Sequence, residues 1–373
     1  IYETTGIQFM SLNSLYSLYA HKKTDPGAFA VAESLVFMPD LFHYWLSGER
    51  TIEATIASTS QMIDCHSGDW AGDMLDELSL PTNILGTTTP PATVIGTLRP
   101  KLAEETGLPA TLRIVAPASH DTASAVAAVP AVQGTSWCYL SSGTWSLLGA
   151  EISKPCVSAE AQAASFTNEL GVNGTFRFLK NIAGLWLVQE CRRDLARQGN
   201  EFDYVALTNL ANEATPLRTI IDPVHAEFHT PSKMLQKIGA FARATQQPVP
   251  SSPGEFVRCA LESLALAYRD KLHTLESILG QRFDVLHIVG GGGKNTLLSQ
   301  MTADATGRQV VVGPYEATAM GNALVQAMAL GQIRDLWHLR QIVATSSELT
   351  VFMPVDGNDW DRAAERFANL RPA

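Results

Sequence analysis

The sequence predicts an α/β protein with two domains, and three observations lead to this prediction. The chain has 373 residues, which suits two domains of ordinary size better than a single core. Hydrophobic residues make up 46% and charged residues 17%, a composition that excludes intrinsic disorder, collagen-like repeats and coiled coil. Short apolar runs typical of strands alternate with longer runs typical of helices, and this alternation indicates an α/β fold.

The first predicted domain covers residues 1–130. Helical patterns are expected over Asp25–Gly48, interrupted at a proline, and over Lys101–Thr106. A strand is expected over Leu112–Val115. The small, turn-rich stretch Pro130–Gly134 follows, and it places the domain boundary near residue 130.

The second predicted domain covers residues 131–373. It begins with a strand at Trp137–Leu140 and includes two long helical patterns, Leu179–Ala196 and Phe256–Leu279. Its last part reads as strand, glycine loop, helix, strand and helix: Val285–Val289, Gly290–Gly293, a helix from Thr296, Gln309–Val312 and Ala319–Leu330.

Charge and cysteine usage narrow the range of partners. Lys and Arg number 27 against 37 Asp and Glu, a net charge of −10 without a basic cluster, so we expect no nucleic-acid partner. The sequence has no apolar run long enough for a membrane span and no export signal at its start, so we expect no membrane partner.

The five cysteines form no C-x-x-C pair, which favours reduced thiols in a cytoplasmic protein. We expect a monomer or homodimer.

The richest local feature is the run Gly290-Gly291-Gly292-Gly293-Lys294-Asn295, between a predicted strand and a predicted helix. Glycines let a ligand approach the backbone, and a helix N-terminus favours anions. The run matches neither a Walker A loop nor the dinucleotide fingerprint. It is either a nucleotide loop of another type or a tight turn. The ligand interpretation is favoured, because four glycines cost backbone entropy without adding packing.

A second turn, Ser141-Ser142-Gly143-Thr144, follows the strand that begins at Trp137. A hairpin turn of Ser, Gly and Thr can direct N–H and O–H donors at phosphate oxygens. Turns of this composition are also common without any ligand. Both interpretations stay open for this turn on its own.

A third segment, Ser119-His120-Asp121-Thr122, follows the strand at Leu112–Val115. Ligand groups of open α/β sheets lie at such strand ends. Neighbouring side chains of an extended segment point to opposite faces, so His120 and Asp121 are not expected to form part of a catalytic triad. Asp121 is therefore either a general base or the cap of a helix that begins at Thr122.

Two histidines, His225 and His229, have the spacing of a metal pair on a helix. Their order does not match H-E-x-x-H, the surrounding prolines indicate a loop, and no third ligand is evident. We interpret them as structural, and no metal ligand is assigned.

Taken in order, these segments resemble the FGGY carbohydrate kinases, which have an actin-like or RNase H-like ATPase fold, and within them most closely the kinases of L-rhamnulose. The resemblance covers nearly the whole chain, although each motif is modest alone. It rests on these segments: Thr5–Phe9, Asn13–Tyr16, Ala57–Gln61, Ser119–Thr122, Ser142–Ser146, Asn181–Trp186 and His287–Leu298.

The resemblance implies ATP-dependent phosphorylation of O1 of L-rhamnulose, with Mg²⁺ as the metal. Asp121 matches the family's catalytic base, and His120, Thr122 and Asn181 match sugar contacts. The nucleotide contacts implied by the same match are Gly143, Thr144, Gln189, Gly290, Gly291, Gly292 and Asn295. Phosphoryl transfer needs mainly alignment, charge neutralisation and a base, so glycine loops with one carboxylate form a sufficient set.

The sequence also departs from the family pattern. Family members begin with a strand and an Asp-x-Gly phosphate loop, and no such segment precedes Ile1. We therefore expect the first domain to lack about one hundred residues, to leave an apolar face or strand edge uncovered, and to show little activity alone. The alternatives are L-fuculokinase or another sugar kinase of this family, and a non-catalytic protein that binds sugar or nucleotide.

Overall fold

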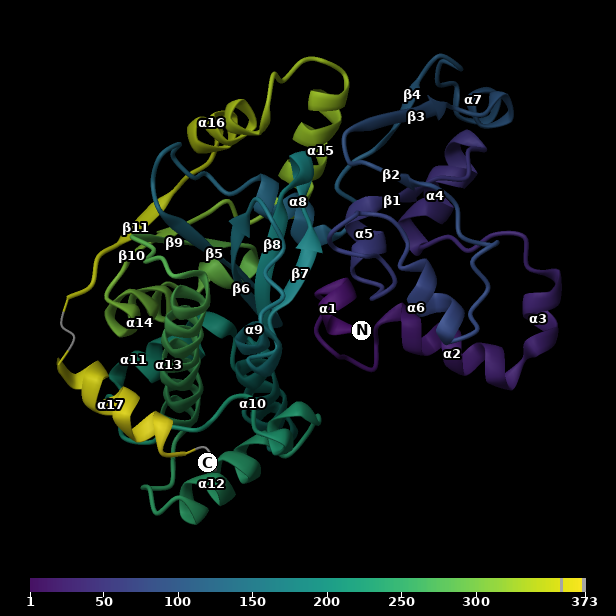
Figure 1. Cartoon of the computed structure of the whole chain (residues 1–373). Helices are drawn as coiled ribbons and strands as arrows, with labels where there is room; N and C mark the ends of the chain where they lie inside the picture. Colours follow the sequence, from purple (N-terminus) through teal and green to yellow (C-terminus); the bar gives the residue numbers. More distant parts are fainter. Residues whose placement is uncertain (356–357, 371–373) are drawn as a thin grey trace. The chain divides into compact units, whose positions relative to one another are not determined.

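The computed structural model describes residues 1–355 and 358–370, which form two compact units (Figure 1). The first unit comprises Ile1–Gln133, Ala150–Leu179 and Ala317–Ser346. The second comprises Gly134–Gly149, Lys180–Glu316 and the described residues from Ser347 onward. Each unit is assembled from separate stretches of chain, so the predicted division at residue 130 stays a prediction about domains along the sequence.

The main sheet has seven strands in the order β11-β10-β9-β5-β6-β8-β7. Strand β9 is parallel to both β5 and β10, whereas the β5–β6, β7–β8 and β10–β11 pairs are antiparallel. Their bounds are Trp137–Ser142 (β5), Trp145–Ile152 (β6), Thr167–Leu170 (β7), Phe176–Ala183 (β8), Val285–Val289 (β9), Gln309–Val312 (β10) and Thr350–Phe352 (β11). The carboxyl ends of β5 and β9 lie at one edge, because Ser141 pairs with Val289.

The first unit adds two small sheets and most of the short helices. Strand β1 (Ile52–Glu53) is parallel to β2 (Thr88–Thr89), and β3 (Thr93–Thr97) is antiparallel to β4 (Arg113–Ala116). Its helices are α1 (Tyr2–Thr5), α2 (Ser14–Thr24), α3 (Pro26–Val31), α4 (Met38–Ser47), α5 (Ala54–Ser58), α6 (Gly72–Glu77), α7 (Pro100–Thr106), α8 (Asp121–Ala127), α9 (Ala159–Ala163), α15 (Ala317–Ala329) and α16 (Leu336–Ser346).

The second unit carries the longest of the described helices, α13 (Pro253–Leu279), and several other helices pack on it. Helix α13 starts at a Ser252 cap with proline at its first position, ends at Gly280 with φ 62°, and buries a long apolar stripe. The others are α10 (Trp186–Arg197), α11 (Tyr204–Glu213), α12 (Met234–Ala244), α14 (Thr296–Thr306) and α17 (Asn358–Ala368). None of the described helices combines the length and apolar character that a membrane crossing requires.

The strand–loop–helix–strand–helix prediction for the last part of the chain is confirmed by β9, α14, β10 and α15. The helix predicted over Leu179–Ala196 is wrong in its first part. Residues up to Ala183 belong to β8, which pairs with β7, and α10 begins only at Trp186. Most of β8 is buried, and its polar residues Arg177, Lys180 and Asn181 do not alternate with apolar ones, so the segment lacks the period of two that indicates a strand.

The helical pattern predicted over Asp25–Gly48 is divided more widely than expected. Helix α3 ends at Val31 and α4 starts at Met38. Between them Leu35 donates its N–H to the Ile84 carbonyl and forms an isolated parallel bridge with Leu85. This long-range backbone pairing replaces the helical turn that the local pattern predicted.

Candidate functional site

Asp121 is the first residue of α8, directly after the loop that follows β4. Its side chain is 76% exposed, and Oδ1 accepts hydrogen bonds from the Thr122 N–H (2.6 Å) and the Thr122 hydroxyl (3.2 Å). The N-cap position belongs to His120, without a side-chain cap bond. The alternative that Asp121 caps a helix starting at Thr122 is therefore wrong, and an anionic carboxylate in the first turn suits the helix dipole.

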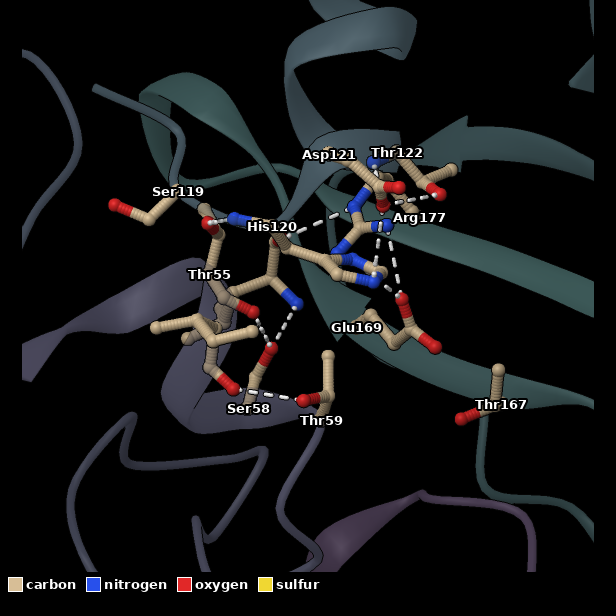
Figure 2. Close-up of polar contacts among 12 residues, drawn as sticks. Thr55, Ser58, Thr59, Ser119, His120, Asp121, Thr122, Thr167, Glu169 and Arg177 are labelled. Atoms are coloured by element: carbon tan, nitrogen blue, oxygen red, sulfur yellow. Dashed lines mark hydrogen bonds and ion pairs between the residues drawn. The ribbon is translucent and has the colours of Figure 1, made fainter. Parts of the chain in front are cut away.

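His120 and Asp121 lie close together, contrary to the expectation that they point to opposite faces. His120 Nε2 is 3.5 Å from Asp121 Oδ1 (Figure 2). The expectation assumed an extended backbone through both residues, whereas His120 is extended and Asp121 begins a helix. The turn between these two conformations brings the imidazole to the carboxylate.

Two further charged groups surround His120, both from the antiparallel pair β7 and β8. Glu169 Oε2 is 3.4 Å from His120 Nδ1, and Arg177 lies 2.8 Å from the same Glu169 oxygen (Figure 2). The Arg177 side chain is fully buried. Burial, and secondarily the Arg177 charge, lower the pKa of His120, while Glu169 and Asp121 act in the opposite direction. The neutral imidazole is thus favoured beside Asp121.

In the second unit the two predicted phosphate loops lie against each other. The β5–β6 hairpin turns at Gly143-Thr144, and the glycine loop follows β9, its neighbour in the sheet. A Cβ atom at Gly292 would lie 2.1 Å from Ser142 Oγ, so the backbones touch closely. Parallel strand ends such as these are where α/β sheets bind ligands.

The glycines of this loop differ in what they do. Gly290 has φ +89°, and Gly292 and Gly293 pack where any side chain would clash with Ser142 or Val312. The sequence argument that these glycines add no packing is therefore wrong for three of the four positions. A Cβ atom at Gly291 would meet nothing within 4 Å, so this position is open to a ligand.

Backbone hydrogen bonds connect the start of α10 to the turn of the β5–β6 hairpin. Leu185 and Trp186 donate their N–H groups to the carbonyls of Gly143 (3.0 Å) and Thr144 (3.1 Å). From the first turns of that helix, Gln189 donates to the Thr144 hydroxyl at 3.2 Å. Two of the predicted nucleotide contacts, Thr144 and Gln189, are thus in direct contact.

Asn181 and Asn295 occupy different settings. Asn181 lies in β8 and is partly buried. Asn295 caps α14, its Oδ1 accepting the Leu298 N–H at 2.9 Å, so this oxygen already has a structural partner.

His225, one of the two histidines with metal-like spacing, has a local structural role, because its Nδ1 accepts the Glu227 N–H. No group of three or more His, Cys, Asp or Glu suited to a metal occurs among the described residues.

Sequence reasoning missed the groups that support the Ser119–Thr122 segment: Glu53, Thr55, Glu169 and Arg177. Glu53 and Thr55 bind the backbone of Ser119 and His120, and Glu169 with Arg177 flanks the His120 ring. Each comes from a part of the chain distant in sequence. An acidic residue at the end of a short strand, as at Glu53, is the local signal that could have pointed to one of them.

Two family descriptions match this chain. The FGGY family of carbohydrate kinases, N-terminal domain, matches residues 1–128, and the C-terminal domain of the same family matches residues 138–330. Among curated relatives, the rhamnulokinase of Bacteroides thetaiotaomicron is 42% identical over 99% of this chain and 75% of the relative. That of Oceanobacillus iheyensis is 38% identical over 95% of this chain and 74% of the relative.

Solved structures of other kinases share the fold. The xylulose kinase of Rhodospirillum rubrum superposes with a TM-score of 0.77 at 21% identity, over 99% of this chain and 73% of that one. The glycerol kinase of Plasmodium falciparum with ADP gives 0.78 at 14% identity, with the same coverage of 99% and 73%. The predicted actin-like α/β fold is thereby confirmed. With both family descriptions matched in order along most of its length, the chain belongs to the FGGY family of carbohydrate kinases.

Proposed function

We propose that this ATP-dependent sugar kinase transfers the γ-phosphoryl group of ATP to O1 of L-rhamnulose, giving L-rhamnulose 1-phosphate. Use of ATP and of a sugar follows from the family. The choice of sugar is supported by relatives named rhamnulokinase, which are 42% and 38% identical over nearly the whole chain.

The observation that carries the proposal is the exposed carboxylate of Asp121 at the start of α8. Asp121 accepts the proton of the O1 hydroxyl while O1 attacks the γ-phosphorus. The bond from that phosphorus to the β,γ-bridging oxygen breaks, and its electron pair leaves with ADP. His120, Thr122 and Asn181 are the proposed sugar contacts. A neutral His120 can hydrogen-bond the sugar through one ring N–H and one acceptor nitrogen.

The nucleotide is proposed to bind in the second unit. Gly143, Thr144 and Gln189 form one side of the phosphate site, and Gly290, Gly291, Gly292 and Asn295 form the other. The close packing of the two loops and the open position at Gly291 support this assignment. Backbone N–H groups at such a loop suit phosphate oxygens.

Mg²⁺ is proposed as the companion of ATP, whose phosphate charge it neutralises when bound. The described residues contain no cage of three or more metal-ligating side chains. Mg²⁺ does not require such a cage, because that ion is usually held by one or two carboxylates, substrate phosphates and water.

We further propose a cytoplasmic monomer or homodimer. The five cysteines are free, and four of them are buried, in agreement with a reducing compartment. Size-exclusion chromatography with light scattering distinguishes the two oligomeric states.

Asp121→Asn tests the proposal in the full-length protein. Loss of the base should lower kcat with L-rhamnulose by roughly 10²–10⁴-fold and leave ATP affinity nearly unchanged. Near-normal turnover would contradict the assignment of the base. Asp203→Asn is the matched control: Asp203 caps α11 through the Ala206 N–H, and Asn is an equally good cap, so activity should not change.

The sugar is tested separately by comparing kcat/KM for L-rhamnulose and L-fuculose in the unaltered protein. A higher value for L-rhamnulose is expected. A preference for L-fuculose would replace the proposed substrate while leaving the assignment of Asp121 intact.

A further inference from the structure

A fully buried carboxylate, Glu53, lies at the junction of β1 and α5 and accepts four hydrogen bonds. The Thr55 N–H donates to Oε1 at 2.9 Å, and the Thr55 hydroxyl and the Ile56 N–H donate to Oε2 at 2.6 and 3.1 Å. The fourth donor is the N–H of Ser119, at 3.1 Å from Oε2. Two of these bonds, from the Thr55 and Ile56 N–H groups, cap α5. The third holds the Thr55 hydroxyl, and the fourth reaches the loop before Asp121.

Thr55 makes the neighbouring connection. Its side chain is fully buried, and its hydroxyl accepts the His120 N–H at 3.1 Å (Figure 2) while donating to Glu53. Two consecutive backbone amides, Ser119 and His120, are thus held by side chains from a distant part of the sequence. The next residue is Asp121.

The clamp formed by Glu53 and Thr55 is itself fixed at both ends. The Glu53 N–H donates to Oδ1 of Asp40, another fully buried carboxylate, at 2.9 Å. At the other end of α5, the Ser58 hydroxyl accepts the Leu170 N–H of β7 at 2.9 Å. Helix α5 therefore ties the loop before Asp121 to the strand that carries Glu169.

We infer that Glu53 and Thr55 are positioning residues for the phosphoryl transfer, which fix the backbone at Ser119 and His120 and so aim the Asp121 carboxylate. The inference rests on the proposed function, because it assigns a purpose to the placement of Asp121. Neither residue is required to touch the sugar or ATP. The physical reason is that a base displaced by about 1 Å can lose 10²-fold in rate, and the exposed Asp121 side chain has few other restraints.

Thr55→Val is the sharpest test, because valine keeps the shape and removes only the hydroxyl. The variant leaves the His120 N–H without its acceptor and Glu53 without one donor. We expect kcat to fall roughly 10–100-fold with KM for ATP unchanged. Amide hydrogen exchange at His120 should become faster. Thr55→Ser restores the hydroxyl and should recover most of both properties.

Thr306→Val is the matched control. Thr306 is also buried, but its hydroxyl bonds the Thr302 carbonyl within its own helix, α14. The variant removes a buried hydroxyl of equal size, so activity should remain near that of the unaltered protein. A general effect of losing a buried hydroxyl would appear in both variants.

Three outcomes would overturn the inference. One is wild-type kcat in Thr55→Val while Asp121→Asn loses activity, which leaves the proposed function standing. Another is a Thr55→Ser variant as impaired as Thr55→Val. If Thr55→Val does not fold, amide hydrogen exchange of His120 in the unaltered protein is the deciding measurement. Protection of this amide up to global unfolding supports the positioning role of Glu53 and Thr55, and rapid exchange overturns it. Full activity of Asp121→Asn instead rejects the proposed function.

Discussion

His120 lies between two carboxylates, Glu169 and Asp121, and yet its environment favours the neutral ring. Its side chain is only 21% exposed, and Arg177 pairs with Glu169 and offsets that carboxylate's charge. Burial is the main cause of the lowered pKa, with Arg177 second. A neutral imidazole donates a hydrogen bond from one ring nitrogen and accepts a hydrogen bond at the other, which suits contact with sugar hydroxyls.

This lowered pKa predicts how stability depends on pH. The unfolded chain, with a histidine pKa of about 6.5, binds a proton more readily than the folded protein. The free energy of unfolding should therefore fall as the pH drops below about 6.5, by at most about 1.4 kcal/mol per pH unit from this one group. His120→Gln removes the titration and should make the fall shallower in urea unfolding at pH 7.5 and 5.5.

His273 also has a lowered pKa, from burial and the nearby Arg269, but it remains in both proteins and cancels in the comparison. Identical falls in the unaltered protein and in His120→Gln would contradict the prediction. The comparison needs no sugar or nucleotide, so its result is independent of the proposed reaction.

At the scale of single residues, the sequence predicted the site residues that have a recognisable local pattern and did not predict those that lack one. Asp121 could be predicted because it follows a strand and precedes a helix. Arg177 could not be predicted, since one arginine within a strand gives no local signal of a partner, and its role follows from the pairing of β7 with β8. The family resemblance supplied the expected roles of His120 and Thr122. Their distances to other groups and their contact partners could be read only from the three-dimensional structure.

At the scale of elements, α8 is positioned by close contact with α15. A Cβ atom on Gly321 of α15 would lie 1.9 Å from the Ser124 carbonyl oxygen, so only glycine permits this approach. The hydroxyl of Thr318, also on α15, donates to the Asp121 carbonyl at 3.3 Å. Helix α15 is more than 190 residues away from Asp121 in sequence, yet its contacts fix the position of α8.

Gly321→Ala should therefore force the two helices apart. We expect the free energy of unfolding to fall by about 1–3 kcal/mol, as in other overpacked cores, and kcat to fall because α8 carries Asp121. Thermal unfolding and steady-state kinetics measure the two effects.

Gly72→Ala is the control for this substitution. Gly72 begins α6, and a Cβ atom there would meet nothing within 4 Å. Alanine is the better helix former, so stability should stay equal or rise slightly. A Gly321→Ala variant that behaved like Gly72→Ala would contradict the role assigned to the contact between α8 and α15.

Elements with a distinct local pattern could be predicted from the sequence, and elements defined by long-range pairing could not. The strand at β9 and the helix at α13 have clear boundaries: a glycine run ends the first, and Ser252 with Gly280 bounds the second. Strand β8 was mistaken for helix because it is buried on both faces. The pairing of Leu35 with Leu85, which separates α3 from α4, has no signature within either segment.

At the scale of the whole molecule, the proposed reaction places sugar and nucleotide on groups from different units. The proposed sugar contacts His120, Asp121 and Thr122 belong to the first unit, and the proposed nucleotide loops around Thr144 and Gly291 belong to the second. A change confined to the glycine loop should therefore alter nucleotide binding without altering sugar binding. The open position at Gly291 makes such a change possible, because a Cβ atom there would meet nothing within 4 Å.

Gly291→Val tests this separation. Without ligand, the variant should melt close to the unaltered protein, since the added side chain has free space. The valine would instead occupy space that the phosphates need, so calorimetry should show weakened ADP binding and unchanged L-rhamnulose binding. In the unaltered protein, ADP at one hundred times its Kd should add about 2.7 kcal/mol to the free energy of unfolding. Most of that gain should vanish in the variant at the same ADP concentration. Equal weakening for both ligands, or undiminished ADP binding, would contradict the assignment of the glycine loop to the nucleotide.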